Sequence, residues 1–328
     1  MLLITFGTRP EWIKIRPIID KLHGKINYRL ICTGQHNDLL DSSVNNYNIE
    51  YLDICVFGKN RLDNIVISIL DRSEYIFKDS SYVMVQGDTT SAFAIALAAF
   101  HRKIPIIHLE AGLRSWDINN PYPEEFNRVA ISNIASIHLC PTVDNYYNLR
   151  SIVGKKYVVG NTVLDCLVNI EPSIGDFVLV TLHRRENIDI MDKWFEAIEN
   201  IANNSNLRFI IPMHPNPDIQ KHKNIFKKVE VINPLGHDEF VDMLSKCAMV
   251  ITDSGGIQEE SAFLKKKSIV CRQTTERQEG EYIFSHLCHD PSRLRSIFDK
   301  IKIELVNNSC PYGDGYASDK ILKILETL

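Results

Sequence analysis

Short apolar runs rich in β-branched residues alternate with longer amphipathic runs along the whole chain. In the first half these runs predict strands over Leu2–Phe6, Tyr28–Cys32, Tyr82–Val85, Ile104–His108 and Ile137–Cys140. Helices are predicted between them near 10–22, 62–77, 89–101, 122–135 and 143–150. In the second half the predicted strands are Phe177–Leu182, Arg208–Pro212, Val229–Ile232, Met249–Thr252 and Ser268–Cys271, with helices near 188–202, 237–246, 255–265 and 291–305. Near-continuous apolar strands separated by helices are typical of parallel sheets covered on both faces.

The strand–helix series occurs twice, and this predicts two doubly wound, Rossmann-like α/β domains in succession. We expect the first over residues 1–167 and the second over 168–311, joined by the Pro- and Gly-containing segment 168–176. Ligands of such sheets bind at the carboxyl ends of the strands, beside a topological switch point. Two such domains facing each other would therefore enclose a central cleft, and residues that follow strands become the candidates for function.

Composition narrows the classes of partner. The chain has 328 residues and a net charge of −4. It therefore lacks the overall positive charge that would favour binding of nucleic acid. The one basic run, Lys265 to Lys267, is expected at a solvated helix end. No apolar stretch reaches the ~18 residues of a membrane span, and residues 1–6 lack the features of a signal peptide. The eight scattered cysteines include no C-x-x-C pair, which favours reduced thiols and a cytoplasmic location.

The first strand runs directly into Gly7-Thr8-Arg9-Pro10-Glu11, with Lys14 one turn later. Thr8 suits an N-cap and Pro10 the first helical turn, while Arg9 and Lys14 lie where a helix N-terminus already favours an anion. The alternative interpretation is a well-capped helix that carries surface charges.

Three acidic residues, Asp88, Glu110 and Glu124, follow successive strands or open the next helix. Neighbouring carboxylates raise one another's pKa, which separates acid and base roles at a single pH. Asp88 alone could instead be a helix cap, and Arg128 could form an ordinary surface i, i+4 pair with Glu124. The cluster of three favours a catalytic interpretation.

The second half offers groups suited to phosphate. His183 follows a predicted strand and is flanked by arginines, so it is a candidate phosphate ligand or proton donor. Ser254-Gly255-Gly256 joins a strand to a helix, which is the pattern of an anion seat built from backbone N–H groups. Glu260 lies one turn further on, in reach of a ribose, and Arg277 adds a cation. A glycine-rich turn with a serine cap is the alternative.

Several familiar motifs are missing from the sequence. It contains no G-x-G-x-x-G dinucleotide fingerprint, no P-loop and no G-x-S-x-G elbow. His286-Leu287-Cys288-His289 is too crowded for a standard zinc site. We therefore expect no metal and no nicotinamide or other cofactor.

Ten segments spread over nearly the whole chain resemble the non-hydrolysing UDP-N-acetylglucosamine 2-epimerases. They are GTRPEWIKIRPII (7–19), TGQH (33–36), VQGDTTSAFAIALAAF (85–100), HLEAGLRSWDINNPYPEEFNR (108–128), PTVDNYYNLR (141–150), VVGNTVLDCL (158–167), VTLHRREN (180–187), DSGGIQEES (253–261), TTERQEG (274–280) and YGDGYASDKI (312–321). The resemblance implies the GT-B fold, a homodimer, and a final helix within 312–328 that packs back on the first domain. It also implies interconversion of UDP-GlcNAc and UDP-ManNAc.

Matched motif by motif, the resemblance assigns roles to individual residues. Catalysis is assigned to Asp88, Glu110, Glu124, Arg128 and His183. UDP binding is assigned to Arg9, Lys14, His183, Ser254, Gly255, Gly256, Glu260 and Arg277. A second, activating UDP-GlcNAc is assigned to Gln35, His36, Arg184, Glu186 and His214. Asp38 and segment 56–62 depart from the activator-binding pattern, which predicts weak activation or none.

Inversion at C2 of a UDP-sugar is difficult because the C2 proton is not adjacent to a carbonyl. Oxidation elsewhere on the sugar needs NAD, whose fingerprint is missing, whereas expulsion of UDP from C1 makes C2–H acidic and leads to a glycal. Elimination and re-addition need cations on the leaving diphosphate and carboxylates at the sugar. The alternatives are a GT-B glycosyltransferase with a UDP-sugar donor, a hydrolysing epimerase that releases UDP, and a binding protein without activity.

Overall fold

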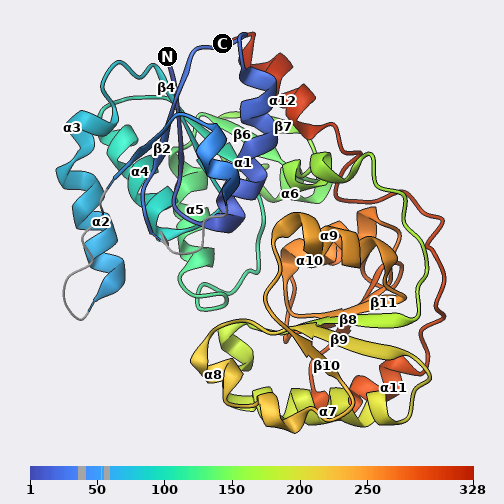
Figure 1. The fold of residues 1–328 in the computed structure, drawn as a ribbon. Coiled ribbons are helices and arrows are strands. Elements are labelled where there is room, and N and C mark those ends of the chain that lie inside the picture. The colour runs from blue at the N-terminus through green and yellow to red at the C-terminus, as the bar shows by residue number, and fades with distance from the viewer. Residues whose placement is uncertain (36–41, 53, 55–59) are drawn as a thin grey trace. The chain divides into compact units, whose positions relative to one another are not determined.

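The structure is a computed structural model that describes residues 1–35, 42–52, 54 and 60–328. The chain divides into two compact units, of which the first comprises Met1–Cys166 with Gly313–Leu328 and the second Leu167–Tyr312. Each unit is built on a single parallel sheet with helices packed against it (Figure 1).

The first unit contains a seven-stranded sheet in the order β3-β2-β1-β4-β5-β6-β7. Its strands are β1 (Leu2–Phe6), β2 (Tyr28–Cys32), β3 (Ile49–Tyr51), β4 (Tyr82–Gln86), β5 (Ile106–Leu109), β6 (Ile137–Cys140) and β7 (Lys155–Val158). Its helices are α1 (Arg9–Leu22), α2 (Arg61–Asp71), α3 (Ser73–Ile76), α4 (Thr90–His101), α5 (Glu124–Ile134), α6 (Val143–Asn148) and α12 (Ala317–Leu325). The strand order reverses between β1 and β4, so the turns after these strands flank a topological switch point.

Two hydrophobic cores cover the two faces of this sheet. Successive side chains of a strand point to opposite faces, so Ile4 of β1 packs with α1 and α12, whereas Leu3 packs with α2 and α4. Helices α1 and α12 lie side by side in Figure 1. Asp165 accepts hydrogen bonds from the N–H groups of Ala317 (3.0 Å) and Ser318 (2.7 Å), which ties the start of α12 to this unit.

The second unit contains a six-stranded sheet in the order β10-β9-β8-β11-β12-β13. Its strands are β8 (Phe177–Thr181), β9 (Arg208–Pro212), β10 (Glu230–Ile232), β11 (Met249–Thr252), β12 (Ser268–Cys271) and β13 (Ser285–Cys288). Its helices are α7 (Met191–Asn203), α8 (Pro217–Gln220), α9 (His237–Lys246), α10 (Gly255–Phe263) and α11 (Leu294–Phe298). Figure 1 shows α9 and α10 on the opposite face of this sheet from α7 and α11. The switch point lies between β8 and β11.

The observed elements correct one predicted helix. Residues 291–305 were expected to form one helix, but Pro291–Arg293 form a 3₁₀ turn and α11 ends at Phe298. The segment beyond is held by Val306, whose N–H donates to the Lys265 carbonyl (2.9 Å), and by Glu304, which pairs with Lys267 (3.2 Å). These contacts draw the chain out of the helix and toward the end of α10.

Lys266 is a second correction. It was expected at a solvated helix end, but it is buried, and its Nζ donates to the carbonyl oxygens of Ser173 and Cys247. Burial lowers the pKa of this ammonium group. Lys266 therefore fastens the segment that enters the second unit to the turn between α9 and β11.

Candidate active site

The switch point of the first unit is closed by a buried carboxylate, Glu11. Its oxygens accept hydrogen bonds from Gly7 N (2.8 Å), Thr8 Oγ1 (2.9 Å) and Thr89 Oγ1 (2.7 Å). Burial raises the pKa of Glu11. The turn after β1 is thereby tied to the turn after β4. No role was assigned to Glu11 from the sequence, although Thr8-x-x-Glu11 has the spacing of a capping box.

Glu110 follows β5 in a left-handed conformation, with φ +63°. Its carboxylate accepts hydrogen bonds from Lys14 Nζ (2.6 Å), from Gln86 Nε2 and from Asn161 Nδ2 (3.4 Å). Lys14 was expected to hold UDP, or to be a surface charge; in the structure it pairs with Glu110 and is half-buried. The partners Gln86 and Asn161 were not identified from the sequence.

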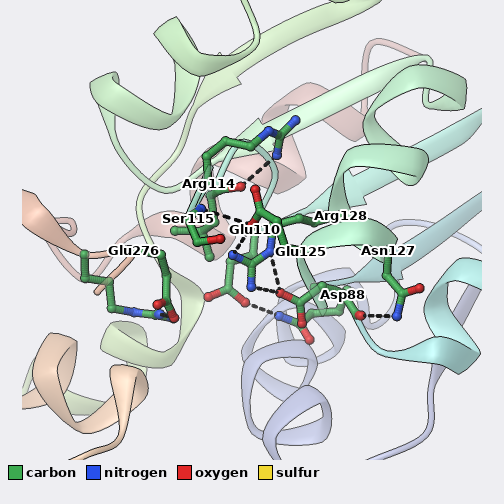
Figure 2. Close-up of polar contacts among 12 residues, drawn as sticks. Asp88, Glu110, Arg114, Ser115, Glu125, Asn127, Arg128 and Glu276 are labelled. Carbon is green, nitrogen blue, oxygen red and sulfur yellow. Dashed lines mark hydrogen bonds and ion pairs between the residues drawn. The ribbon is translucent and has the colours of Figure 1, made fainter. Parts of the chain in front are cut away.

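Asp88 follows β4 and lies against Arg128 of α5 (Figure 2). Arg128 Nε and Nη2 both donate to Asp88 Oδ2, the former at 2.9 Å, and Nη1 donates to Glu125 at 3.0 Å. Arg128 is only 5% exposed, so the surface-pair interpretation is wrong. The helix-cap interpretation of Asp88 is also wrong, because Thr89 caps α4 by accepting from Ala92 N–H at 3.1 Å.

Glu124 is the first residue of α5 and is half-buried. Its neighbour Glu125 is buried and accepts hydrogen bonds from the N–H groups of Ser115 (3.0 Å) and Trp116 (3.3 Å) as well as from Arg128. Glu125 therefore fixes the loop after β5 to the helix that carries Glu124 and Arg128. Its role was not predicted, because the two adjacent glutamates have no distinguishing pattern.

In the second unit, a fully buried carboxylate organises the end of β8. Asp253 accepts hydrogen bonds from His183 N (3.0 Å), Arg184 N (2.8 Å) and Asn187 Nδ2 (3.0 Å). The imidazole of His183 stacks on that of His214, with ring centroids 5.3 Å apart. Burial lowers the pKa of both histidines, which favours neutral rings at pH 7.

The Ser254-Gly255-Gly256 turn lies at the N-terminus of α10 and next to Arg277. A Cβ on Gly255 would come 2.4 Å from Arg277 Nη1, so only glycine leaves room for the guanidinium. Arg277 is buried and bonds Glu259 (2.7 Å) and Glu276. The structure thus brings the predicted anion-binding turn and Arg277 together. Glu259 and Glu276, to which the sequence analysis gave no role, hold Arg277 in place.

Glu260 and Arg9, the two remaining residues assigned to UDP, lie in different units. Glu260 is buried on α10, and its Oε1 lies 3.0 Å from His237 Nε2. Arg9 is the first residue of α1 and is half-buried beside the Thr8 cap. Arg9 therefore lies at the N-terminus of α1 and Glu260 within α10, in the helices where the sequence predicted them.

The residues assigned to an activator have partners of their own. Gln35 Oε1 accepts from Ser91 N–H (3.1 Å), Glu186 pairs with Arg272 (2.9 Å), Arg184 N–H donates to Asp253, and His214 stacks on His183. His36, Asp38 and residues 56–59 of the segment 56–62 lie outside the described residues.

The described residues contain neither a cluster of metal ligands nor a membrane-spanning helix. No group of three or more His, Cys, Asp or Glu residues there is arranged to hold a metal ion. In the same part of the chain, no helix has both the length and the apolar character needed to cross a membrane.

Two doubly wound units, each with charged groups at its switch point, define a two-domain, Rossmann-like α/β protein. A family model described as UDP-N-acetylglucosamine 2-epimerase matches residues 20–326, and the chain belongs to this family. The UDP-N-acetylglucosamine 2-epimerase of Campylobacter jejuni is 38% identical, with 99% of this chain and 97% of that protein covered.

Solved structures extend the likeness to the fold. The crystal structure of the Neisseria meningitidis UDP-GlcNAc 2-epimerase, bound to UDP-GlcNAc, matches with a TM-score of 0.89 and 33% identity over 100% of both chains. MurG of Acinetobacter baumannii matches with a TM-score of 0.66 at 10% identity over 100% of this chain and 99% of its own, and shows the fold alone. The predicted α/β class and GT-B fold are thereby confirmed.

Proposed function

We propose that the protein is a non-hydrolysing epimerase that interconverts UDP-GlcNAc and UDP-ManNAc at C2, without a cofactor. The observation that carries this proposal is the pair of carboxylates after neighbouring strands β4 and β5, each ion-paired to a cation: Asp88 with Arg128 and Glu110 with Lys14. Family membership supports the substrate class.

The chemistry proceeds in two halves. In the first, the C1–O bond to UDP breaks and a carboxylate removes the C2 proton, which gives a glycal and UDP. In the second, a protein acid returns a proton to the opposite face of C2 and UDP adds back to C1. Proton removal and return on opposite faces require separate groups, and Asp88, Glu110 and Glu124 are the ones we assign to them.

Arg128 and Lys14 serve these carboxylates rather than the diphosphate. Arg128 presents two N–H groups to one oxygen of Asp88 and leaves the other oxygen to the substrate. Lys14 sits on both oxygens of Glu110, at 2.6 and 2.5 Å. A fixed carboxylate needs little reorganisation when the proton moves, which lowers the barrier.

We assign the diphosphate to the N-terminus of α10. The N–H groups of Gly255 and Gly256, the hydroxyl of Ser254 and the helix dipole favour an anion there. Arg277 adds positive charge against Gly255, and His183 and Arg9 are further diphosphate contacts. Glu260 is assigned to the ribose.

The test is incubation of the protein with UDP-GlcNAc alone, followed by phosphorus and proton NMR. The proposal predicts UDP-ManNAc in equilibrium with substrate and only a trace of free UDP. Stoichiometric UDP with free ManNAc would identify a hydrolysing epimerase. An unchanged substrate that turns over only with an added acceptor would identify a glycosyltransferase, and binding without any turnover a regulator.

We propose a homodimer formed through α4 and α5. Helix α4 is apolar at every position from Ala92 to Phe100, which is unusual for a helix with a solvent-facing side. Phe100 and Phe126 are 53% and 48% exposed, and Phe126 packs edge-on against Phe93. Light scattering should give twice the chain mass, and Phe100→Glu with Phe126→Glu should give the monomer mass.

We also propose a cytoplasmic location, and weak activation or none by a second UDP-GlcNAc. Five buried cysteines, Cys32, Cys140, Cys247, Cys271 and Cys288, form no disulfide. This supports a reducing compartment, and cell fractionation tests it. For activation, initial rates should depend near-hyperbolically on substrate concentration. A reverse reaction that starts only after UDP-GlcNAc is added would contradict this.

A further inference from the structure

The turn that presents Asp88 is held by a histidine to which no role has been assigned. His108 lies on β5, opposite Val85 of β4, and its side chain is fully buried. Its Nε2 is 2.8 Å from the carbonyl oxygen of Gly87. A carbonyl oxygen only accepts, so Nε2 carries the proton and donates it.

Gly87 is the residue that turns the chain from β4 toward Asp88. Its φ is +68°, in the left-handed region, and its N–H donates to Leu109 O at 3.0 Å. The next carbonyl, that of Asp88, accepts from Asn127 Nδ2 at 2.8 Å (Figure 2). Both peptide groups around Asp88 are therefore fixed by side chains, one from β5 and one from α5.

The second ring nitrogen of His108 is notable because Nδ1 has no hydrogen-bond partner among the described residues. A buried nitrogen without a hydrogen-bond partner lowers the stability of the folded protein, so a histidine at this position has to serve another purpose. The His108 imidazole gives its one hydrogen bond to the turn that carries Asp88, and the rest of the ring is buried. This arrangement suits a residue that positions Asp88.

We propose that His108 is a positioning residue for Asp88: its neutral imidazole holds the Gly87 carbonyl and so fixes where the Asp88 carboxylate meets Arg128 and the substrate. The inference rests on the proposed function, because it takes Asp88 as one of the catalytic carboxylates. Displacement of a reacting group by about 1 Å can lower turnover by about 10²-fold.

The chain supplies a matched control in His138. This residue lies beside His108 on the neighbouring strand β6, in register with it, and is equally buried. Its Nδ1 also lacks a partner in the described structure, and its Nε2 bonds Val153 O at 3.0 Å, a carbonyl at the opposite end of the strands. A merely structural role for a buried histidine should therefore look the same at both positions.

The experiment compares His108→Met, which cannot donate, with His108→Gln, which can, and with His138→Met. We expect His108→Met to lower kcat by about 10- to 100-fold with KM and UDP affinity within about two-fold, and His108→Gln to recover most of the loss. His138→Met should lower the melting temperature similarly and leave kcat within about two-fold. In the background Asp88→Asn, His108→Met should cause no further loss, because it acts through Asp88.

Equal losses of kcat in the two methionine variants, no recovery with glutamine, or a further loss in the Asp88→Asn background would each overturn the inference. If His108→Met fails to fold, ¹⁵N NMR of histidine-labelled wild-type protein decides, with His108→Gln used for assignment. The Nε2–H tautomer is expected, and the Nδ1–H tautomer would refute the inference. Wild-type protein that forms no epimer would instead refute the proposed function, and the two failures are thus distinct.

Discussion

Arg128 donates two hydrogen bonds to one carboxylate oxygen of Asp88, although the two residues are 40 positions apart in the chain. The contact joins the turn after β4 to the first turns of α5. Glu125 holds Arg128 in this position by accepting a hydrogen bond from its Nη1 at 3.0 Å. The acid that we assign to proton transfer is therefore held by a side chain that is itself buried and paired.

Replacement of Arg128 by methionine should abolish this arrangement. Turnover should fall by at least about 10²-fold, the lower range for loss of a positioned acid or base. Stability should fall by about 3–5 kcal/mol, because Glu125 is left buried without its cation. Steady-state kinetics and urea denaturation measure the two effects.

Arg29→Met is the matched control for that variant. Arg29 also pairs with a glutamate, Glu50 at 2.6 Å, but near the amino end of β2 and away from the turns that carry Asp88 and Glu110. Its loss should leave turnover unchanged. A comparable loss of turnover in both variants would remove Arg128 from the site.

Gly255→Ala tests the anion seat. The new Cβ would lie 2.4 Å from Arg277 Nη1 and 2.7 Å from its Cζ, so the guanidinium must leave its place between Glu259 and Glu276. UDP affinity measured by calorimetry should fall by about tenfold, and the melting temperature should drop. Gly256→Ala, whose Cβ meets nothing closer than Ser254 Oγ at 4.0 Å, should keep the wild-type melting temperature. Unchanged UDP affinity in Gly255→Ala would contradict the assignment.

Buried histidines predict a loss of stability in mild acid. Burial lowers the pKa of His108 to about 3, and His138 and Arg114 act in the same direction. The unfolded chain binds this proton near pH 6.5, so stability is present above that pH and is lost as pH falls toward 3. Between pH 7 and 5, wild type should lose about 2 kcal/mol more than His108→Gln in urea denaturation. Identical pH dependence would show that folding does not lower the pKa of His108.

Local pattern was enough to predict most of the framework. Apolar runs such as Leu2–Phe6 and Met249–Thr252 are bounded by turn residues, and their strands have the predicted limits. Strands β3, β7 and β13 were missed because IEY, KKYV and SHLC carry too few apolar residues to stand out. The predicted helix over 291–305 failed because contacts from Val306 and Glu304 to residues 265–267 override its local preference.

The candidate site was predictable only in part, for a similar reason. Asp88 and Glu110 directly follow strands, and topology alone brings them to one sheet edge. The partners Lys14 and Asn161 come from distant turns, and no spacing in the sequence relates them to Glu110. Lys266 was misassigned because three successive lysines are usually exposed, whereas only the fold supplies the carbonyls that bind its ammonium group.

Lys266→Met should destabilise the protein by about 1–3 kcal/mol, because the buried Cys247 carbonyl and the Ser173 carbonyl lose their donor. Lys265→Met is the control, since Lys265 bonds the exposed Asn308 carbonyl and should cost less than about 0.5 kcal/mol. Chemical denaturation of both variants gives the comparison. Equal stabilities would mean that the buried ammonium contributes nothing.

The central claim is that UDP leaves before C2 is reprotonated, and incubation in D₂O tests it most directly. The protein with UDP-GlcNAc in D₂O should give an epimer that carries deuterium at C2, because the returning proton comes from a carboxyl group that exchanges with solvent. A trace of free glycal with UDP should accumulate, and loss of Asp88, Glu110 or Glu124 should each slow the exchange by at least about 10²-fold. Mass spectrometry and proton NMR of the isolated product read the label. An epimer that retains its original C2 proton would contradict elimination, because formation of the glycal removes that proton.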